Sequence, residues 1–243
     1  KNQKNLIELP PSIPEDFKPD KERARIIIES VLTEKRNILT EPEAKDVLDA
    51  YQIPIVKTLI AHDVDEAVKQ AKSIGFPVAL KILSKDISHN SDVGGVLLNI
   101  ESASILQLSA EGMLARIKKS NPDAKIEGFT VQAMVDCPND YELIIGVTSD
   151  SIFGPVILFG HGGISVEVVN DKAVALPPLN MKLANDLVQR TRIARVLKGY
   201  RDVKPANMEA ILVTLVKISQ LIVDHPELQE LDINPLVANN NGV

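Results

Sequence analysis

The sequence predicts an α+β fold whose sheets are antiparallel. Helical and strand patterns are interleaved along the chain, and several neighbouring strands are separated only by short turns, which is typical of hairpins. A doubly wound parallel sheet would instead need a crossover connection between successive strands. We expect two lobes of similar size, separated by a hinge near residues 127–135. The predicted domains are a linker with an N-terminal helix at 1–35, a first lobe at 36–128, and a second lobe at 129–243 that is truncated at its C-terminal end.

The first lobe is predicted to follow a proline-rich stretch. Prolines among charged residues give residues 1–20 the composition of an extended linker, and residues 21–35 have the apolar spacing of a helix. Thr40 and Glu43 form a capping box, which predicts the start of another helix. Residues 54–56 are then expected to form a short strand.

A helix from Asp63 to Gly75 is expected to lead into the sheet of the first lobe, because aspartate caps a helix and glycine ends one. Apolar runs predict the strands, and a polar loop containing glycine separates the first two of them. The expected strands of this lobe are 76–82 and 96–100, with a helix at 103–119. A strand at 129–135 is expected at the hinge, where the second lobe begins.

The second lobe is predicted to begin with hairpins and to end with helices and one further strand. A glycine loop follows the second strand, and a bend at Pro235 is expected to interrupt the last one. The expected strands are 142–148, 156–159, 166–169, 173–176, 230–233 and 236–238, with helices near 180–197 and 205–224.

The composition excludes several classes of function. The net charge is −6 and no Lys/Arg cluster is present, so the chain lacks the basic surface that nucleic-acid binding needs. No apolar run approaches the roughly 18 residues of a membrane span. The single cysteine, Cys137, fits a reducing compartment, and we expect a cytoplasmic location without membrane or nucleic-acid partners.

Lys81 and the loop after it form one candidate site. Lys81 lies in an otherwise apolar strand, where a buried ammonium group needs an anion. The loop ends in Gly94 and Gly95, and glycines let backbone N–H groups approach an anion closely. The pair is therefore consistent with a phosphate cradle. An equally balanced alternative is a lysine that reaches water at the strand edge, followed by an ordinary hairpin loop.

Asp232 and Asn234 form a second candidate site. Residues two apart in a strand face the same side, so the carboxylate and the amide oxygen would be presented together. Such hard oxygen ligands suit Mg²⁺ bound with substrate phosphates. The alternative is a simple turn, because Asp and Asn-Pro both favour turns, and the residues alone favour that alternative.

Two weaker candidates remain. His89 lies in the loop after Lys81, where Asp92 could orient its ring, and a neutral histidine is a competent nucleophile. Without further context a solvated loop histidine is the simpler interpretation. The segment Gly160–Gly163 could approach a phosphate or could form a plain turn, and a short glycine motif alone does not decide between them.

Four ordered segments together resemble the ATP-grasp unit of ADP-forming acyl-CoA synthetases, relatives of the succinyl-CoA synthetase β subunit. The resemblance covers roughly residues 36–243. Four motifs in order are far more specific than one. The segments are 76–82, 89–96, 153–163 and 230–236.

The resemblance implies an ATP-grasp fold in which two lobes clasp the nucleotide in a cleft. It implies phosphate contacts from Lys81, Mg²⁺ ligation by Asp232 and Asn234, and a phosphoryl relay through His89. The remaining implied nucleotide contacts are Gly94, Gly95, Gln132, Ala133, Met134, Val135, Glu142, Gly162 and Gly163.

The implied reaction is acid + ATP + CoA ⇌ acyl-CoA + ADP + phosphate, through a phosphohistidine. The CoA-binding and ligase domains would be partners in the same chain or complex, and we expect the isolated fragment to be inactive.

Three features depart from the family pattern: Asn90 stands where the family usually has lysine, His161 stands in the glycine loop, and a further acidic metal ligand would lie beyond Val243.

Two other functions are compatible with the same residues. One is a non-catalytic nucleotide-sensing module that regulates a fused protein N-acetyltransferase. The other is an ATP-grasp ligase that activates a carboxylate for an amine. The loops at 92–95 and 162–163 favour the CoA branch over this last alternative.

Overall fold

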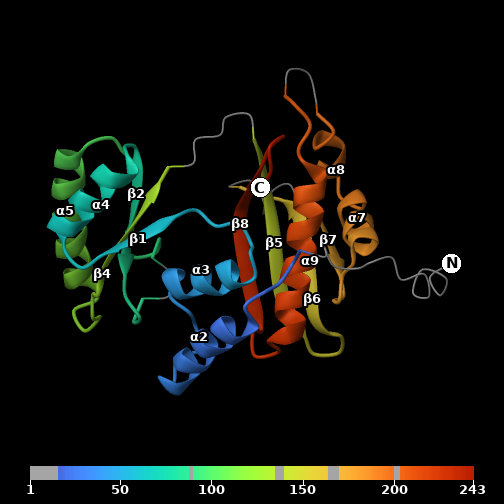
Figure 1. Cartoon of the computed structure of the whole chain (residues 1–243). Helices are drawn as coiled ribbons and strands as arrows, with labels where there is room; N and C mark the ends of the chain where they lie inside the picture. The colour runs from blue at the N-terminus through green and yellow to red at the C-terminus, as the bar shows by residue number, and fades with distance from the viewer. Residues whose placement is uncertain (1–15, 88–89, 135–139, 164–169, 200–202) are drawn as a thin grey trace. The chain divides into compact units, whose positions relative to one another are not determined.

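The computed structural model describes residues 16–87, 90–134, 140–163, 170–199 and 203–243. The chain divides into two compact units (Figure 1). The first unit comprises Ile26–Asp49 and Ile55–Asp136, and the second comprises Lys1–Arg25, Ala50–Pro54 and Cys137–Val243.

The first unit is built on an antiparallel sheet with strand order β1-β4-β2-β3. Apolar residues at alternate positions of β2 and β4, such as Leu80, Ile82 and Val131, lie in its core. The strands are β1 (Thr58–Ala61), β2 (Val78–Leu83), β3 (Val96–Ile100) and β4 (Gly128–Ala133).

Two helices, α4 (Val64–Ile74) and α5 (Ala103–Ser120), complete this core and pack against each other (Figure 1). Leu106 and Met113 of α5 are fully buried in it. Because side chains alternate along a strand, Lys81 of β2 and Thr130 and Gln132 of β4 point to the opposite face of the sheet. The fold thus places these polar groups together on the face away from the core.

The helix starts follow the predicted caps. Thr40 N–H donates to Glu43 Oε2 over 2.7 Å at the start of α3 (Glu41–Ala50), as a capping box requires. Asp63 accepts from Glu66 N–H over 2.7 Å at the start of α4, which ends at Gly75 with φ of 95°. The preceding helix, α2 (Lys21–Thr33), covers most of the predicted 21–35.

The second unit is built on an antiparallel sheet with strand order β7-β6-β5-β8. Its apolar residues include Leu143, Ile145 and Phe159, all fully buried. The strands are β5 (Tyr141–Asp150), β6 (Gly154–His161), β7 (Lys172–Ala175) and β8 (Glu230–Ala238), and the helices are α7 (Met181–Gln189), α8 (Ile193–Val196) and α9 (Met208–Asp224). Helix α7 packs against α9 and contacts β6 and β7.

Two antiparallel sheets with interleaved helices confirm the predicted α+β class. The expected lobe boundary at 128/129 differs from the observed grouping, in which residues up to Asp136 belong to the first unit. The reason is that β4 hydrogen-bonds to β1 and β2 in the first sheet.

Three predicted elements differ in detail. Residues 54–56 form no strand, because pairing with β4 begins only at Thr58. The helix predicted near 180–197 is split, since the Asp171 carboxylate accepts from the N–H groups of Arg192 and Ile193, each over 2.7 Å, and starts α8. Strand β8 continues through Pro235 and shifts register against β5 instead of ending there.

Some predicted features lie outside the described residues. These are His89, Val135, Cys137, the strand at 166–169 and residues 1–15 of the linker.

Candidate functional site

Lys81 is the centre of a charged cluster in the first unit. Its ammonium group donates to Glu41 Oε1 over 2.8 Å, and the Lys81 side chain is 26% exposed. An ammonium group has three N–H donors, and among the described residues only Glu41 accepts from this one. Lys81 can therefore keep its internal partner and still donate to a ligand.

The Glu41 carboxylate contacts several hydrogen-bond donors. Lys45 Nζ lies 3.0 Å from the same oxygen, and the buried Gln132 donates to it through Nε2. Burial opposes ionisation of Glu41, but the hydrogen bond and charge of Lys81 and the charge of Lys45 outweigh it, so the pKa of Glu41 is lowered. Glu41 was not predicted from the sequence, where it reads as an ordinary acidic residue in the first turn of a helix.

The predicted glycine loop has a structural role that is visible in its hydrogen bonds. Gly94 N–H donates to Ser91 O over 3.1 Å, and Gly95 N–H donates to Asn90 O over 2.7 Å. A Cβ on Gly95 would lie 2.6 Å from a methyl carbon of Ile82, so no larger residue fits there without movement. Both N–H groups donate within the loop in this structure, as in the ordinary hairpin loop that the sequence left open, and a phosphate contact of Gly94 and Gly95 remains a prediction.

The segment after β4 is similarly engaged. Met134 N–H donates to Pro77 O over 3.2 Å, while Ala133 is exposed at the end of the strand. Among the described residues of the implied nucleotide contacts at 132–135, Gln132 joins the Lys81 cluster through Glu41.

A cavity of about 530 Å³ lies in the first unit beside this cluster, and both Glu41 and Thr130 line it. The Thr130 hydroxyl is buried and has no hydrogen-bond partner among the described residues. The cavity is thus polar and of a size that suits a small molecule or part of one.

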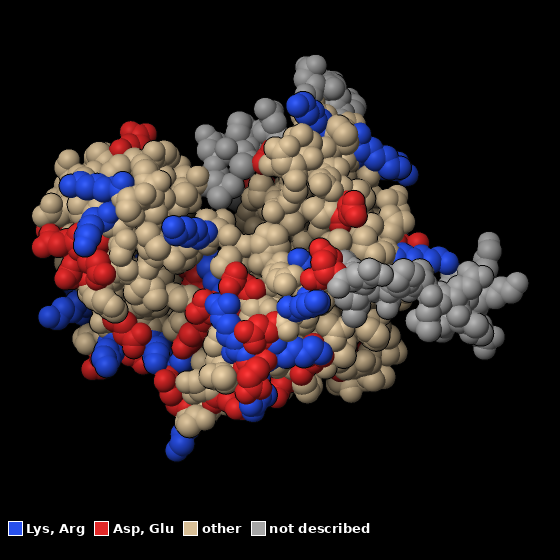
Figure 2. Space-filling view, viewed as in Figure 1, with Lys and Arg blue, Asp and Glu red and all other residues tan. Residues whose placement is uncertain are grey.

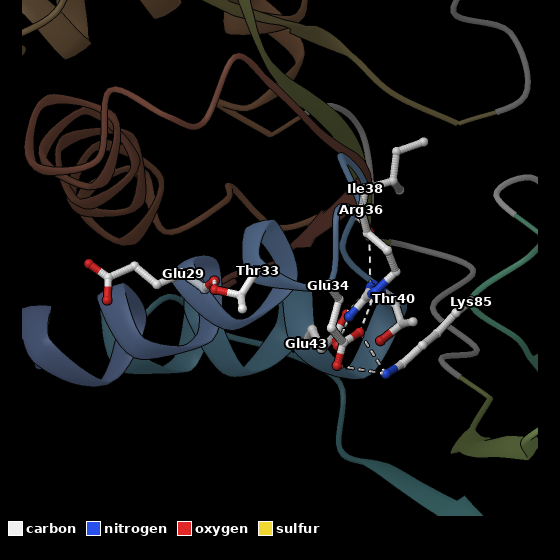
Figure 3. A network of polar contacts seen from close by, with 8 residues as sticks. All are labelled: Glu29, Thr33, Glu34, Arg36, Ile38, Thr40, Glu43 and Lys85. Carbon is white, nitrogen blue, oxygen red and sulfur yellow. Dashed lines mark hydrogen bonds and ion pairs between the residues drawn. The ribbon is translucent and has the colours of Figure 1, made fainter.

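A second network borders the cavity (Figure 3). Arg36 donates to Glu43 Oε1 over 2.6 Å and to Glu34 Oε2 over 2.8 Å, and Lys85 lies 2.9 Å from Glu34. The hydrogen bond that Arg36 donates to Glu43 is the main reason why the pKa of Arg36 is raised. Arg36 and Lys85 are thus balanced by two carboxylates, those of Glu34 and Glu43. Lys81 and Lys45, in contrast, share the single carboxylate of Glu41.

In the second unit, four predicted residues come together. Gly162 N–H donates to Glu142 O over 2.8 Å, and Gly163 N–H donates to Asn234 Oδ1 over 2.9 Å. A Cβ on Gly163, whose φ is 78°, would collide with the Glu142 carboxylate. Strands β5, β6 and β8 therefore bring a carboxylate, an amide and a glycine loop to one place.

Asp232 lies on β8, two residues before Asn234 and exposed like it. Desolvation and the negative charge of Glu230 raise the pKa of Asp232, and no described cation pairs with it. An oxygen set of this kind fits a hard divalent cation such as Mg²⁺, which would supply the missing positive charge. Within the described ranges, no group of three or more His, Cys, Asp and Glu side chains is arranged to hold a metal ion.

His161 is placed on the other face of this sheet. It pairs with Leu143, a fully buried residue, and directly paired residues in an antiparallel sheet share a face. Its Nδ1 atom is buried without a described hydrogen-bond partner. His161 therefore belongs to the helix-covered side of the second unit, whereas the neighbouring Gly162 contacts Glu142.

The surface charges are mixed. On the face shown in Figure 2, Lys and Arg side chains alternate with Asp and Glu side chains. Among the described helices, none is long and apolar enough to cross a membrane.

Comparisons with known proteins identify the family. Residues 30–243 match the ATP-grasp domain family. The chain is 40% identical over 227 residues to acetate–CoA ligase [ADP-forming] I of Archaeoglobus fulgidus, covering 93% of the chain and 33% of that protein. It is 37% identical to the β subunit of acetate–CoA ligase [ADP-forming] I of Pyrococcus furiosus, covering 89% of the chain and 92% of the subunit.

A solved structure agrees with these relatives. The dinucleotide-forming acetyl-coenzyme A synthetase 1 of Ca. Korarchaeum cryptofilum, in complex with coenzyme A and Ca-AMPCP, superposes with a TM-score of 0.83 at 34% identity. The match covers 90% of this chain and 95% of that chain. The chain thus spans about a third of its single-chain relative and nearly all of the separate β subunit. On these grounds the protein belongs to the ATP-grasp family and is similar to the β subunits of ADP-forming acetate–CoA ligases.

Proposed function

We propose that this chain binds ATP or ADP with Mg²⁺ and carries out the phosphoryl-transfer step of an ADP-forming acyl-CoA synthetase. The observation that carries the proposal is Lys81, a partly buried cation with N–H donors that its one described acceptor, Glu41, does not use. The match of the chain to nearly the whole β subunit of such a ligase supports a nucleotide-binding role for this cation. The overall reaction would be acid + ATP + CoA ⇌ acyl-CoA + ADP + phosphate, in the cytoplasm where these compounds occur.

In this proposal the first unit supplies positive charge and nucleotide contacts. Lys81 would donate to phosphate oxygens, and the residues from Gln132 to Val135 would contact the base. Phosphoryl transfer depends mainly on positioning and charge neutralisation, which a fixed ammonium group supplies.

The second unit would supply the metal-binding oxygens. Asp232 and Asn234 would hold Mg²⁺, with Glu142 and the Gly162–Gly163 loop beside them. When bound with the nucleotide, Mg²⁺ neutralises phosphate charge. Desolvation and Glu230 raise the pKa of Asp232, and a bound divalent cation would oppose this shift by favouring the ionised form.

His89 is proposed as the phosphoryl carrier. A ring nitrogen of neutral His89 would attack the γ-phosphorus of ATP, forming an N–P bond while the bond to the β-phosphate oxygen breaks and ADP leaves. The reverse step would rebuild ATP. The CoA-binding and ligase portions would exchange this phosphoryl group with the acyl substrate. The longer relatives have enough additional chain to contain such portions.

Titration calorimetry with MgATP tests the binding step. We expect Lys81→Ala to weaken MgATP binding by about tenfold or more, because it removes a charge-assisted hydrogen bond to phosphate. The control is Lys69→Ala, an exposed lysine on α4, which should bind MgATP like the wild type. Equal affinity of the wild type and Lys81→Ala would remove Lys81 from the site. Nucleotide binding without any phosphoryl transfer would favour a sensing module attached to an acetyltransferase.

A further inference from the structure

We propose that Glu41 is a positioning residue for nucleotide phosphates: it holds Lys81, Lys45 and Gln132 as one preorganised donor set. The proposal rests on the proposed function, since it assigns the ligand of Lys81 to a phosphate. It adds two residues, Glu41 and Lys45, to which the sequence motifs give no role.

The geometry is convergent. One carboxylate oxygen, Glu41 Oε1, lies 2.8 Å from Lys81 Nζ and 3.0 Å from Lys45 Nζ, and it also accepts from Gln132. Lys45 additionally donates to Thr58 Oγ1 over 2.6 Å. Donors from α3, β2 and β4 are thereby fixed around a single oxygen atom, which is how a binding site is kept at productive geometry.

The charge balance favours an anion. Two ammonium groups share one carboxylate, so the cluster keeps a net positive charge, unlike the Arg36 and Lys85 network in which Glu34 and Glu43 balance both cations. Without Glu41 the ammonium groups of Lys81 and Lys45 would repel each other at close range. One of the two lysines would then lose its proton or move its side chain away.

An alternative is that Glu41 prevents Lys81 from binding a phosphate. The number of N–H donors on the Lys81 ammonium group argues against it. A lysine ammonium group has three N–H bonds, and Glu41 takes one from Lys81. A phosphate can thus approach Lys81 while Glu41 stays in place. Glu41 is held in place in turn by its three donors and by its position in the first turn of α3.

The pH dependence gives a readout that a purely structural role would not change. Burial lowers the pKa of Lys45, Glu41 raises it and Lys81 lowers it again. Among the described residues, Glu41 and Lys81 are the charged groups that shift the pKa of Lys45, whereas β1 and β4 contribute Thr58 and Gln132, which do not titrate. Replacing Glu41 therefore leaves only influences that deprotonate Lys45.

The experiment is MgATP titration of Glu41→Gln from about pH 7 to pH 9.5, with thermal melts to verify folding. We expect binding weaker by about tenfold, and a loss that deepens as the pH rises, where the wild type changes little. The matched control is Glu43→Gln. It removes a carboxylate from the same helical turn, but wild-type Glu43 pairs with Arg36 and not with Lys81. It should lower the melting temperature and leave MgATP affinity unchanged.

The outcomes separate this inference from the proposed function. If Glu41→Gln binds MgATP as tightly as the wild type at every pH, or more tightly, while Lys81→Ala loses affinity, the positioning role is wrong and the nucleotide site stands. If neither substitution changes affinity, both proposals fail. Should Glu41→Gln not fold, Lys45→Met, which keeps the Glu41–Lys81 contact, must still weaken binding by several-fold, and unchanged affinity there overturns the inference.

Discussion

At the residue scale, Asp232 combines a structural cost with a proposed function. Its folded pKa is raised, so the ionised carboxylate is less stable in the folded chain than in the unfolded one. The unfavourable contribution is absent below the unfolded value of about 4, where both states are protonated, and is fully present above the folded value.

We therefore predict that Asp232→Asn raises the melting temperature at about pH 7 and has little effect near pH 3. The same substitution should abolish most of the Mg²⁺ dependence of ATP affinity, because it removes a carboxylate ligand. Calorimetric scans at both pH values, together with ATP titrations with and without Mg²⁺, check the two effects. An unchanged Mg²⁺ dependence would show that the metal binds elsewhere.

Gly163 gives a second prediction at this scale. Its φ of 78° and the collision of an added Cβ with Glu142 both disfavour any side chain. We expect Gly163→Ala to lower the free energy of unfolding by about 1–3 kcal/mol, as measured by urea denaturation. Gly242→Ala is the control, because an added Cβ there meets nothing within 4 Å. Equal stability of the two variants would contradict the described packing of the glycine loop.

At the element scale, a polar cluster ties helix α9 to the two earlier chain segments of the second unit, Lys1–Arg25 and Ala50–Pro54. The buried Tyr51 donates to Asp224 Oδ2 over 2.9 Å, and Lys21 lies 2.8 Å from Asp224 Oδ1. Burial opposes the charge on Asp224, but these donors and Gln220 outweigh it and lower the pKa of Asp224. Residues distant in sequence are thus joined within the second unit.

We predict that Tyr51→Phe lowers the free energy of unfolding by about 0.5–1.5 kcal/mol near neutral pH, because it removes the hydrogen bond to a charged acceptor. A depressed folded pKa contributes stability above the unfolded value of Asp224, and this contribution is lost as the pH falls through the folded value. The difference between variant and wild type should therefore shrink in acid. Urea denaturation across this pH range is the measurement, and a difference that does not vary with pH would argue against ionised Asp224 as the acceptor.

Local signals explain which elements could be predicted from the sequence. The capping residues Thr40 and Asp63 act on their own helices, and both helices begin where expected. The errors arise where a distant residue decides the outcome. Asp171 starts α8 from a different part of the chain, and residues 54–56 lack a strand because β4 pairs only from Thr58 onward.

The candidate site shows the same division. Lys81, Asp232 and Asn234 stand out in the sequence because a cation in an apolar strand and an oxygen pair in a strand are unusual locally, and their roles remain predictions. Glu41 was missed, since nothing near it in the sequence shows that β2 and β4 will place Lys81 and Gln132 against it. The N–H groups of Gly94 and Gly95 donate within their own loop, and a contact of these groups with an anion remains a prediction.

At the scale of the whole molecule, the chain corresponds to the β subunit of its relatives and to about a third of the single-chain enzymes. In the proposed reaction, which is divided among several domains, a carrier would move the phosphoryl group between them. A histidine suits this task, because its phosphoramidate is reactive enough to transfer the group onward. We therefore expect no turnover of acetate and CoA by this chain alone.

Phosphohistidine formation tests the central claim of phosphoryl transfer most directly. The chain, supplied with the CoA-ligase portion, would be incubated with Mg²⁺ and ATP labelled at the γ-phosphate. We predict an acid-labile, base-stable label on the wild-type chain that is absent from His89→Asn. Absence of this label from the wild type, or its persistence in His89→Asn, would contradict the account.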